Sequence, residues 1–204
     1  MSLDKSNKTL IDFNVHDVQI NVSGDTMIPL TYAVSISLEK QLADKIIYGD
    51  GNPQLTLYND NGYTCALGLT ALDDELDIAL GFKEKLATGL ADVQVTKSTK
   101  CSVFFETDYA GVDGIRKVKK VWLYGVELKP ANESYSQDED EINQSTVTYD
   151  GTIFGTNKKD STGDSDYVDS STGITPKVYK VSAIPTDTFY SDFEASVPVP
   201  KALA

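Results

Sequence analysis

Apolar and polar residues alternate with a period of two through most of this chain, and this pattern constrains its fold more than any other feature. Tyr32, Val34 and Ile36, for example, alternate with small or polar residues, so one face of their segment is expected in a core and the other toward water. The same reasoning predicts strands at residues 18–22, 54–58, 63–69, 93–97, 101–108, 115–127, 144–154 and 177–184. We therefore expect a mainly β fold.

A hairpin turn is expected at residues 59–62, Asn-Asp-Asn-Gly, because Asn-Gly readily adopts positive φ angles. The longest strand, at 115–127, is apolar on both faces. Its first face is expected to carry Trp122, Tyr124, Val126 and Leu128, and its second face Val121 and Leu123. A strand of this kind has to be covered on both sides, by a second sheet or by a neighbouring subunit.

One segment, residues 71–81, has helical spacing instead. Leu72, Leu76 and Leu80 form a single apolar stripe, which is typical of a helix packed on a core. Thr70 is expected to cap this helix, and Gly81 is expected to end it.

The chain is strongly acidic, with 18 Lys and Arg against 31 Asp and Glu and a formal net charge of −13. Most of this excess lies between residues 130 and 170. Tight nucleic-acid binding is excluded as a function class, because such binders neutralise phosphates with Lys and Arg. An anionic membrane surface is disfavoured for the same reason. The first residues lack an apolar signal region, so export by a cleaved signal peptide is not expected.

The residue types present do not favour a catalytic or metal centre. His16 is the one histidine; it could be a base or a metal ligand, but we interpret it as a solvent-facing or hydrogen-bonded residue. Cys65 and Cys101 are expected to be reduced and buried, which leaves a zinc site without its usual ligands. We expect no enzyme activity, no metal and no cofactor. A glycosidase that uses a pair of carboxylates stays open as an alternative.

Three parts of the chain together resemble the phage major tail proteins, the tail tube subunits of long-tailed, non-contractile phages and prophages. The first part holds TYAVSISLEK at residues 31–40 and YGDG at 48–51. The second holds KKVWLYGV at 119–126, DEDEIN at 138–143 and TYDGTI at 148–153. The third is the predicted helix. The similarity covers roughly residues 12–185 and rests on the order and spacing of these segments.

This resemblance implies two packed antiparallel sheets, sandwich- or barrel-like, with one flanking helix and long loops. It implies a single domain at residues 1–185. The composition itself, rich in Ser, Thr, Gly and Asp, predicts an irregular acidic loop at 155–175, and the prolines of the tail predict an extended C-terminal arm at 186–204. The resemblance also implies hexameric rings stacked into a hollow tube of the virion tail, assembled in the host cytoplasm. The implied partners are other copies, the tape measure protein and passing DNA in the lumen, and the tail terminator and baseplate or distal tail proteins at the ends. Neither specific DNA binding nor membrane binding is implied.

Particular residues can be assigned to these surfaces. A loop at residues 41–53 is expected to contact the next ring through Ile46, Ile47 and Tyr48; alternatively, these side chains complete the core of their own subunit. Glu39, on the polar face of its strand, is a candidate acid in the lumen. The charged residues that could meet at a subunit interface are Lys117, Lys119, Lys120, Asp138, Glu139, Asp140 and Glu141.

The alternative function is a soluble β-sandwich that binds carbohydrate or another ligand through its 11 tyrosines and Trp122. Aromatic residues in such a domain more often belong to the core. Self-assembly at raised concentration separates the two functions, because a tube subunit forms rings or tubes and a simple binding module stays monomeric.

Overall fold

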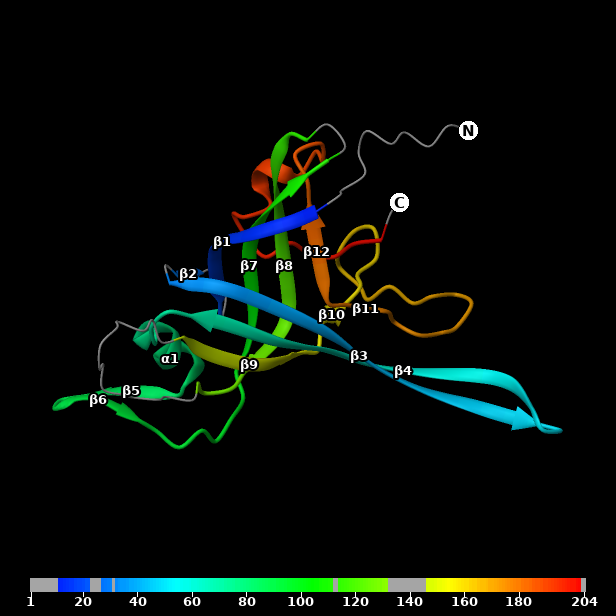
Figure 1. The fold of residues 1–204 in the computed structure, drawn as a ribbon, viewed down its shortest axis with the longest axis horizontal. Coiled ribbons are helices and arrows are strands. Elements are labelled where there is room, and N and C mark those ends of the chain that lie inside the picture. Colours follow the sequence, from blue (N-terminus) through cyan, green and yellow to red (C-terminus); the bar gives the residue numbers. More distant parts are fainter. Residues whose placement is uncertain (1–10, 23–26, 31, 112–113, 132–145, 203–204) are drawn as a thin grey trace, which may run out of the picture.

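The computed structural model describes residues 11–22, 27–30, 32–111, 114–131 and 146–202 (Figure 1). In this part of the chain nearly all regular structure is β-strand, with one α-helix, which confirms the mainly β prediction. The elements are, in chain order, β1 (Ile11–Asn21), β2 (Met27–Pro29), β3 (Ala33–Gly49), β4 (Asn52–Leu69), α1 (Asp74–Leu80), β5 (Lys83–Leu86), β6 (Gly89–Asp92), β7 (Lys100–Ala110), β8 (Arg116–Leu128), β9 (Val147–Ile153), β10 (Thr156–Asn157), β11 (Lys177–Val178), β12 (Lys180–Ala183) and the 3-10 turn η2 (Tyr190–Asp192).

The main sheet has eight strands, and all of its pairings are antiparallel. Its path runs β2-β1-β7-β8-β9-β4-β3, and β12 pairs with β8. β8 joins the two halves, because residues 120–123 pair with β12 and residues 126–128 pair with β9. In Figure 1 the strands β7, β8 and β12 run across the direction of β9, β4 and β3. The sheet thus folds over itself, and the sandwich-like prediction with a flanking helix is confirmed.

A glycine bulge lets β8 face two different clusters of apolar side chains. Gly125 has a φ of +61°, and the pairing of β8 with β7 shifts register beside it. Trp122 and Tyr124 precede the bulge and face one cluster, whereas Val126 and Leu128 follow it and lie in the main core. The predicted common face for these four side chains is therefore wrong, because the extra residue of a bulge reverses the alternation beyond it.

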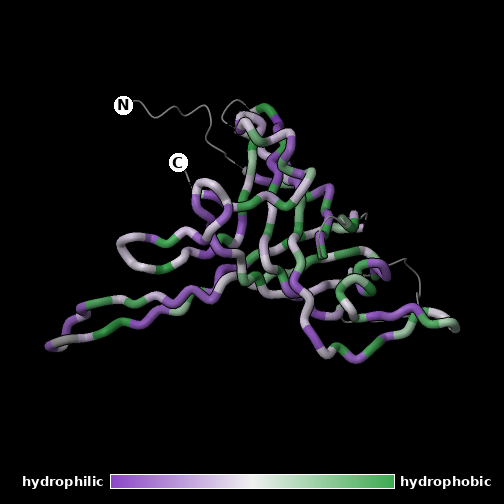
Figure 2. Tube along the Cα trace, turned by 180° about the vertical axis from the view of Figure 1, so that it is seen from behind, coloured by the Kyte–Doolittle hydropathy of each residue, from purple (hydrophilic) through white to green (hydrophobic). Residues whose placement is uncertain are grey.

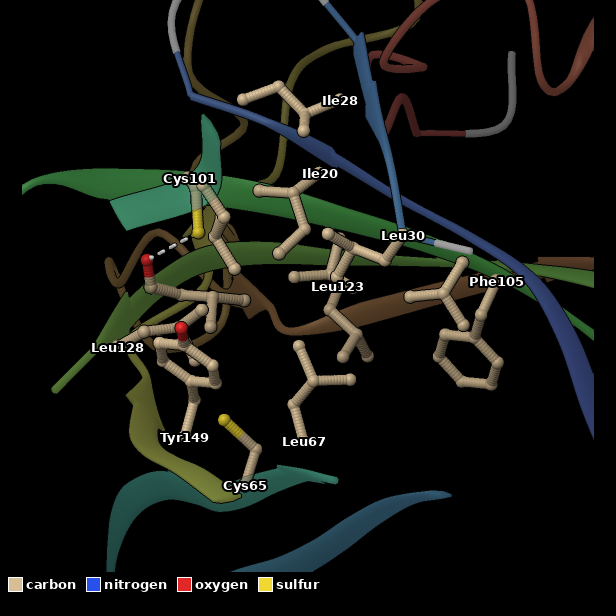
Figure 3. Close-up of a cluster of buried hydrophobic side chains, with 14 of the residues drawn as sticks. Ile20, Ile28, Leu30, Cys65, Leu67, Cys101, Phe105, Leu123, Leu128 and Tyr149 are labelled. Atoms are coloured by element: carbon tan, nitrogen blue, oxygen red, sulfur yellow. Dashed lines mark hydrogen bonds between the residues drawn. The ribbon is translucent and has the colours of Figure 1, made fainter. Parts of the chain in front are cut away.

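The main core lies between the two halves of the sheet (Figure 3). Leu67 of β4 and Leu123 of β8 are both buried there. The two cysteines are free and buried, as expected. Burial raises the pKa of Cys65 to about 11 and the pKa of Cys101 to about 12, so both are thiols at neutral pH. The Cys101 thiol donates a hydrogen bond to the carbonyl oxygen of Val126 at 3.3 Å.

Helix α1 begins later than the sequence predicts. Asp73, and not Thr70, caps it, and the Asp73 carboxylate accepts a hydrogen bond from the backbone N–H of Leu76 at 3.0 Å. The predicted cap is wrong because Thr70 lies directly after β4, where its backbone N–H donates to the carbonyl of Tyr32, just before β3, and so holds it at the end of the hairpin. Gly81 ends the helix with a φ of +80°, as predicted.

The predicted strand at residues 93–97 is also wrong. The short hairpin of β5 and β6 ends before it, and Val93 donates its backbone N–H to the carbonyl of Phe82 at 3.0 Å. This bond ties the chain to the end of the helix, so the segment does not join a sheet.

The turn expected at residues 59–62 lies inside β4, which continues through it. Gly62 has the expected positive φ, +86°. Its role is a close approach to β9, since a Cβ atom at Gly62 would lie 2.3 Å from the carbonyl oxygen of Ile153. The hairpin turn lies instead at Asp50 and Gly51, whose φ angles of +50° and +79° are the positive values that a two-residue turn requires.

The C-terminal segment, residues 186–202, packs against β8 instead of extending from the domain. The indole N–H of Trp122 donates to the carbonyl of Phe193 at 2.6 Å, and the hydroxyl of Tyr124 donates to the carbonyl of Pro198 at 2.9 Å. Phe193 is buried in one cluster with Phe104 and Trp122. The second face of β8 is therefore covered by its own chain.

Candidate assembly surfaces

Residues 42–58 form a two-stranded ribbon, here called the projecting hairpin, that extends beyond the body of the domain (Figure 1). Among the described strands, β3 and β4 pair here only with each other, whereas residues 63–69 of β4 also pair with β9. The expected loop at 41–53 is therefore wrong, because these residues are the ends of two long strands and the tight turn between them.

One side of the projecting hairpin, the aromatic face, exposes four large apolar side chains. The cross-strand partners Asp44–Tyr58 and Ile46–Thr56 lie on this face, and alternation along β3 places Leu42 and Tyr48 on it as well. The exposed fractions of its apolar residues are 51% for Leu42, 43% for Ile46, 65% for Tyr48 and 68% for Tyr58.

The opposite side, the aliphatic face, is equally open. Ile47 pairs with Leu55, and Lys45 pairs with Leu57. The exposed fractions are 41% for Ile47, 54% for Leu55 and 49% for Leu57. Figure 2 shows both hydrophobic and hydrophilic stretches along the two strands of the projecting hairpin. Neither face is covered by the described part of the chain.

An isolated two-stranded hairpin is marginally stable in water at best, and contiguous exposed apolar residues mark interaction surfaces. Ile46, Ile47 and Tyr48 do not complete the core of their own subunit, which excludes one of the two interpretations above. Their contact with a neighbouring ring stays a prediction.

A second surface, here called the polar face, is the outer side of β3, β4 and β9 on the body. Residues on this side belong to three cross-strand rows: Ser35, Gly68 and Thr148; Ser37, Ala66 and Asp150; and Glu39, Thr64 and Thr152. The alternate residues, such as Leu67 and Tyr149, face the main core. Glu39 is exposed. The rows consist of small side chains and two carboxylates, and together with Lys129 several of them line an open pocket of about 490 Å³.

The predicted interface lysines of β8 have partners within their own chain. Lys120 is buried, and its Nζ lies 2.6 Å from the carboxylate of Glu194. Lys119 is paired with Asp12. Intrachain ion pairs thus account for both side chains, and an interface role for them stays a prediction. Of the other predicted interface charges, Lys117 is half-buried, whereas Asp138, Glu139, Asp140 and Glu141 lie outside the described residues.

The structure also assembles a cluster that sequence reasoning missed. His16 lies at a bulge of β1, where the register with β7 shifts. Its Nδ1 lies 3.5 Å from the Glu106 carboxylate and 3.7 Å from that of Asp17, and its Nε2 lies 3.6 Å from the Asp108 carboxylate. Only the pairing of β1 with β7 brings together residues so far apart in the sequence, so no local motif indicates the cluster.

Electrostatics favours an ion-pair network for this cluster. Hydrogen bonds from Arg116 and Asn14 lower the pKa of Asp108 to about 2. Burial raises the pKa of Glu106, and the nearby charge of Asp17 adds to this shift. Ligand atoms of His16, Asp17 and Glu106 lie within 4.8 Å of one another, a spacing that a metal ion could bridge. Arg116 pairs with Asp108 and Lys120 lies 4.0 Å from Glu106, and the amide of Asn14 donates to Asp108 at 2.7 Å, so the cluster fastens β1 to β7.

No family model and no curated protein matches the sequence. Among solved structures, the chain is similar to one from the cryo-EM structure of the anti-feeding prophage (AFP) baseplate, with 8% sequence identity and a TM-score of 0.42. The match covers 72% of this chain and 93% of that chain. A TM-score of this size does not establish a shared fold, so the functional conclusion depends on the surfaces of the molecule. The one α-helix among the described residues is too short to cross a membrane.

Proposed function

We propose that this chain is a structural, non-enzymatic subunit of a phage tail tube, which assembles into stacked hexameric rings. The observation that carries this proposal is the projecting hairpin, whose two faces expose apolar side chains with no cover from the described part of the chain. The resemblance of the segments in β3, β8 and β9 to phage major tail proteins supports the same function.

The projecting hairpin suits head-to-tail assembly. A hairpin that binds a different surface of the next copy makes a heterologous contact, which closes into a ring or repeats along an axis. Burial of one Leu or Ile side chain stabilises a contact by about 1.5–3 kcal/mol. Each subunit contributes several such side chains, including Ile46, Ile47 and Leu55, so repeated contacts give a strong assembly.

Edge strands offer the contacts within a ring. Among the described strands, β3 is one end of the main sheet and β2 is the other. An unpaired strand edge is a template for pairing with another chain. Neighbouring subunits would join edge to edge through β3, and the polar faces of successive subunits would then form a continuous inner wall.

The polar face suits the wall of a conduit. Glu39 and Asp150 would repel a polyanion over a range of about 8–10 Å at physiological salt. The small side chains around them would offer few contacts to a passing polymer. The tape measure protein and the genomic DNA would pass along this wall as cargo. The tail terminator and the baseplate or distal tail proteins would bind the ends of the tube. The chain would lie in the virion tail, after assembly in the host cytoplasm.

Assembly of the purified chain tests this proposal. The wild-type protein should form rings or tubes at raised concentration, seen by negative-stain microscopy and sedimentation velocity. Ile47→Ser combined with Leu55→Ser removes two apolar side chains from the aliphatic face, which should raise the concentration needed for assembly at least about a hundredfold. The matched control combines Val168→Ser with Ile174→Ser, at residues that are 55% and 65% exposed outside the projecting hairpin.

Assembly of the control should equal that of the wild type. Since all four positions are exposed, the thermal stability of the monomer should change little in either variant. A wild-type chain that stays monomeric at every concentration and salt, and binds a glycan, would refute the tube function and favour the carbohydrate-binding alternative.

A further inference from the structure

An apolar groove of about 560 Å³ lies between β12 and the C-terminal segment. Val181 and Phe193 line its more buried part. Phe189 and Val199 line its open part, and each of these two residues is 51% exposed. The groove therefore has the shape and composition of a binding site and no cover from the described part of the chain.

Hydrogen bonds hold the groove in place before any partner arrives. Trp122 and Tyr124 of β8 donate to the carbonyls of Phe193 and Pro198. The backbone N–H of Lys159 donates to the carbonyl of Pro200 at 2.8 Å. A preformed site avoids the entropic cost of ordering its walls on binding.

Charge distinguishes the two faces of the projecting hairpin as occupants of this groove. The charged residues that line the groove are Lys158, Lys201 and Asp192, so its local charge is positive although the whole chain carries −13. The aromatic face carries Asp44, whereas the aliphatic face carries Lys45. The aromatic face is the complementary one.

We propose that the groove of one copy receives the aromatic face of the projecting hairpin of the next copy. This inference rests on the proposed function and names the acceptor surface of its main contact. Ile46 and Tyr48 would fill the apolar part, and Asp44 would lie near Lys158 and Lys201. The volume of the groove falls within the range of about 300–1,000 Å³ that is typical of ligand pockets. A space of this size can hold a few large side chains.

The occupant has to come from another copy. The projecting hairpin points away from β12 and the C-terminal segment of its own chain (Figure 1), so it does not reach the groove beside them. Docking through the aromatic face leaves the aliphatic face open, and a further copy would cover it. The projecting hairpin would thus lie between two neighbours.

Cysteine cross-linking between two variants tests the pairing directly. One protein carries Tyr48→Cys and the other carries Val199→Cys. Under mild oxidation, the mixture should form a disulfide-linked dimer at least about ten times faster than a mixture of Tyr48→Cys with the control Val168→Cys. The native Cys65 and Cys101 are buried and contribute little background. Equal cross-linking of the two mixtures would overturn the proposal.

Charge reversal gives an independent measurement. Asp44→Lys and Lys201→Glu should each raise the concentration needed for assembly about tenfold, and the protein that carries both substitutions should recover most of this loss. Lys201 also donates to the carbonyl of Thr162 at 3.0 Å, but loss of that bond cannot be repaired from the projecting hairpin. Recovery in the double variant therefore reports the contact between copies, and its absence contradicts the proposed pairing.

Val199→Glu separates this inference from the function on which it rests. If Val199→Glu assembles normally while Ile47→Ser with Leu55→Ser does not, the chain is a tube subunit whose hairpin docks elsewhere. If both proteins assemble normally, neither the groove nor the aliphatic face is an assembly surface and this inference is overturned, whereas a wild-type chain that never assembles refutes the proposed function itself. If Val199→Glu only lowers the melting temperature of the monomer, the groove belongs to the fold of its own chain and the proposal is overturned.

Discussion

Phe193→Ala should loosen the packing of the C-terminal segment on β8. The Phe193 side chain is only 4% exposed and packs with Phe104 and Trp122. Loss of a buried Phe side chain costs about 3–5 kcal/mol when the cavity cannot collapse. The Tyr124 hydroxyl and the Lys120–Glu194 ion pair still hold the neighbouring residues of this segment in the variant, so we expect a loss at the lower end of this range, about 3 kcal/mol in the free energy of unfolding. The hydrogen bond from Trp122 to the carbonyl of Phe193 weakens at the same time.

Urea unfolding followed by tryptophan fluorescence measures both effects, because Trp122 is the one tryptophan of the chain. The indole is fully buried, so its emission should shift to the red in the native state of the variant. Phe189→Ala is the matched control: Phe189 is 51% exposed, and its loss should cost less than about 1 kcal/mol. An unfolding free energy within 1 kcal/mol of the wild type, with unchanged emission, would show that the segment does not cover β8 as described.

Three further predictions concern the helix cap, the acid stability and the thiols. Asp73→Ala should destabilise the protein by about 1 kcal/mol in thermal unfolding, because it removes the cap of α1. Arg116 lowers the pKa of Asp108 to about 2. The Asp108 carboxylate therefore stabilises the folded state fully above its unfolded pKa near 3.8, and this stabilisation is lost as the pH falls toward 2. Asp108→Asn should make the free energy of unfolding less dependent on pH between about 4 and 2, as measured by urea unfolding at each pH. Cys65 and Cys101, with pKa values raised to about 11 and about 12, should resist a thiol reagent at pH 8 until urea unfolds the chain.

Much of the sheet could be predicted from the period-two pattern, because the long strands β7 and β8 each bury at least one face in their own chain. The exceptions are places where pairing between distant strands decides the local structure. The bulge at Gly125 is one: a Cβ there would lie 2.7 Å from the carbonyl oxygen of Gly155, a contact that no local pattern reveals. The His16 cluster is another, since it depends on how β1 meets β7.

The position of the hairpin turn also depends on pairing between distant strands. Residues 41–63, between the body parts of β3 and β4, contain two turn dipeptides, Asp50-Gly51 and Asn61-Gly62, and both glycines have positive φ angles. Local chemistry cannot choose between them. The choice is made by β9, which pairs with β4 from Tyr63 onward and needs Gly62 for its close approach. Because β4 must run straight past β9, the turn falls at the other dipeptide and the hairpin becomes long.

Because the hairpin is long, strands that are apolar on both faces have two different structural outcomes in this chain. Within β3, residues 35–39 alternate cleanly, with Ile36 and Leu38 packed against the main core and Glu39 outside. From residue 42 the alternation is lost, and both faces become apolar, as they also are in β8. In β8 the chain covers both faces itself, through the main core and the C-terminal segment. In the projecting hairpin the described chain covers neither. The same two-sided pattern therefore indicates a buried strand in one place and an assembly surface in the other, and only the position of the strand within the fold distinguishes them.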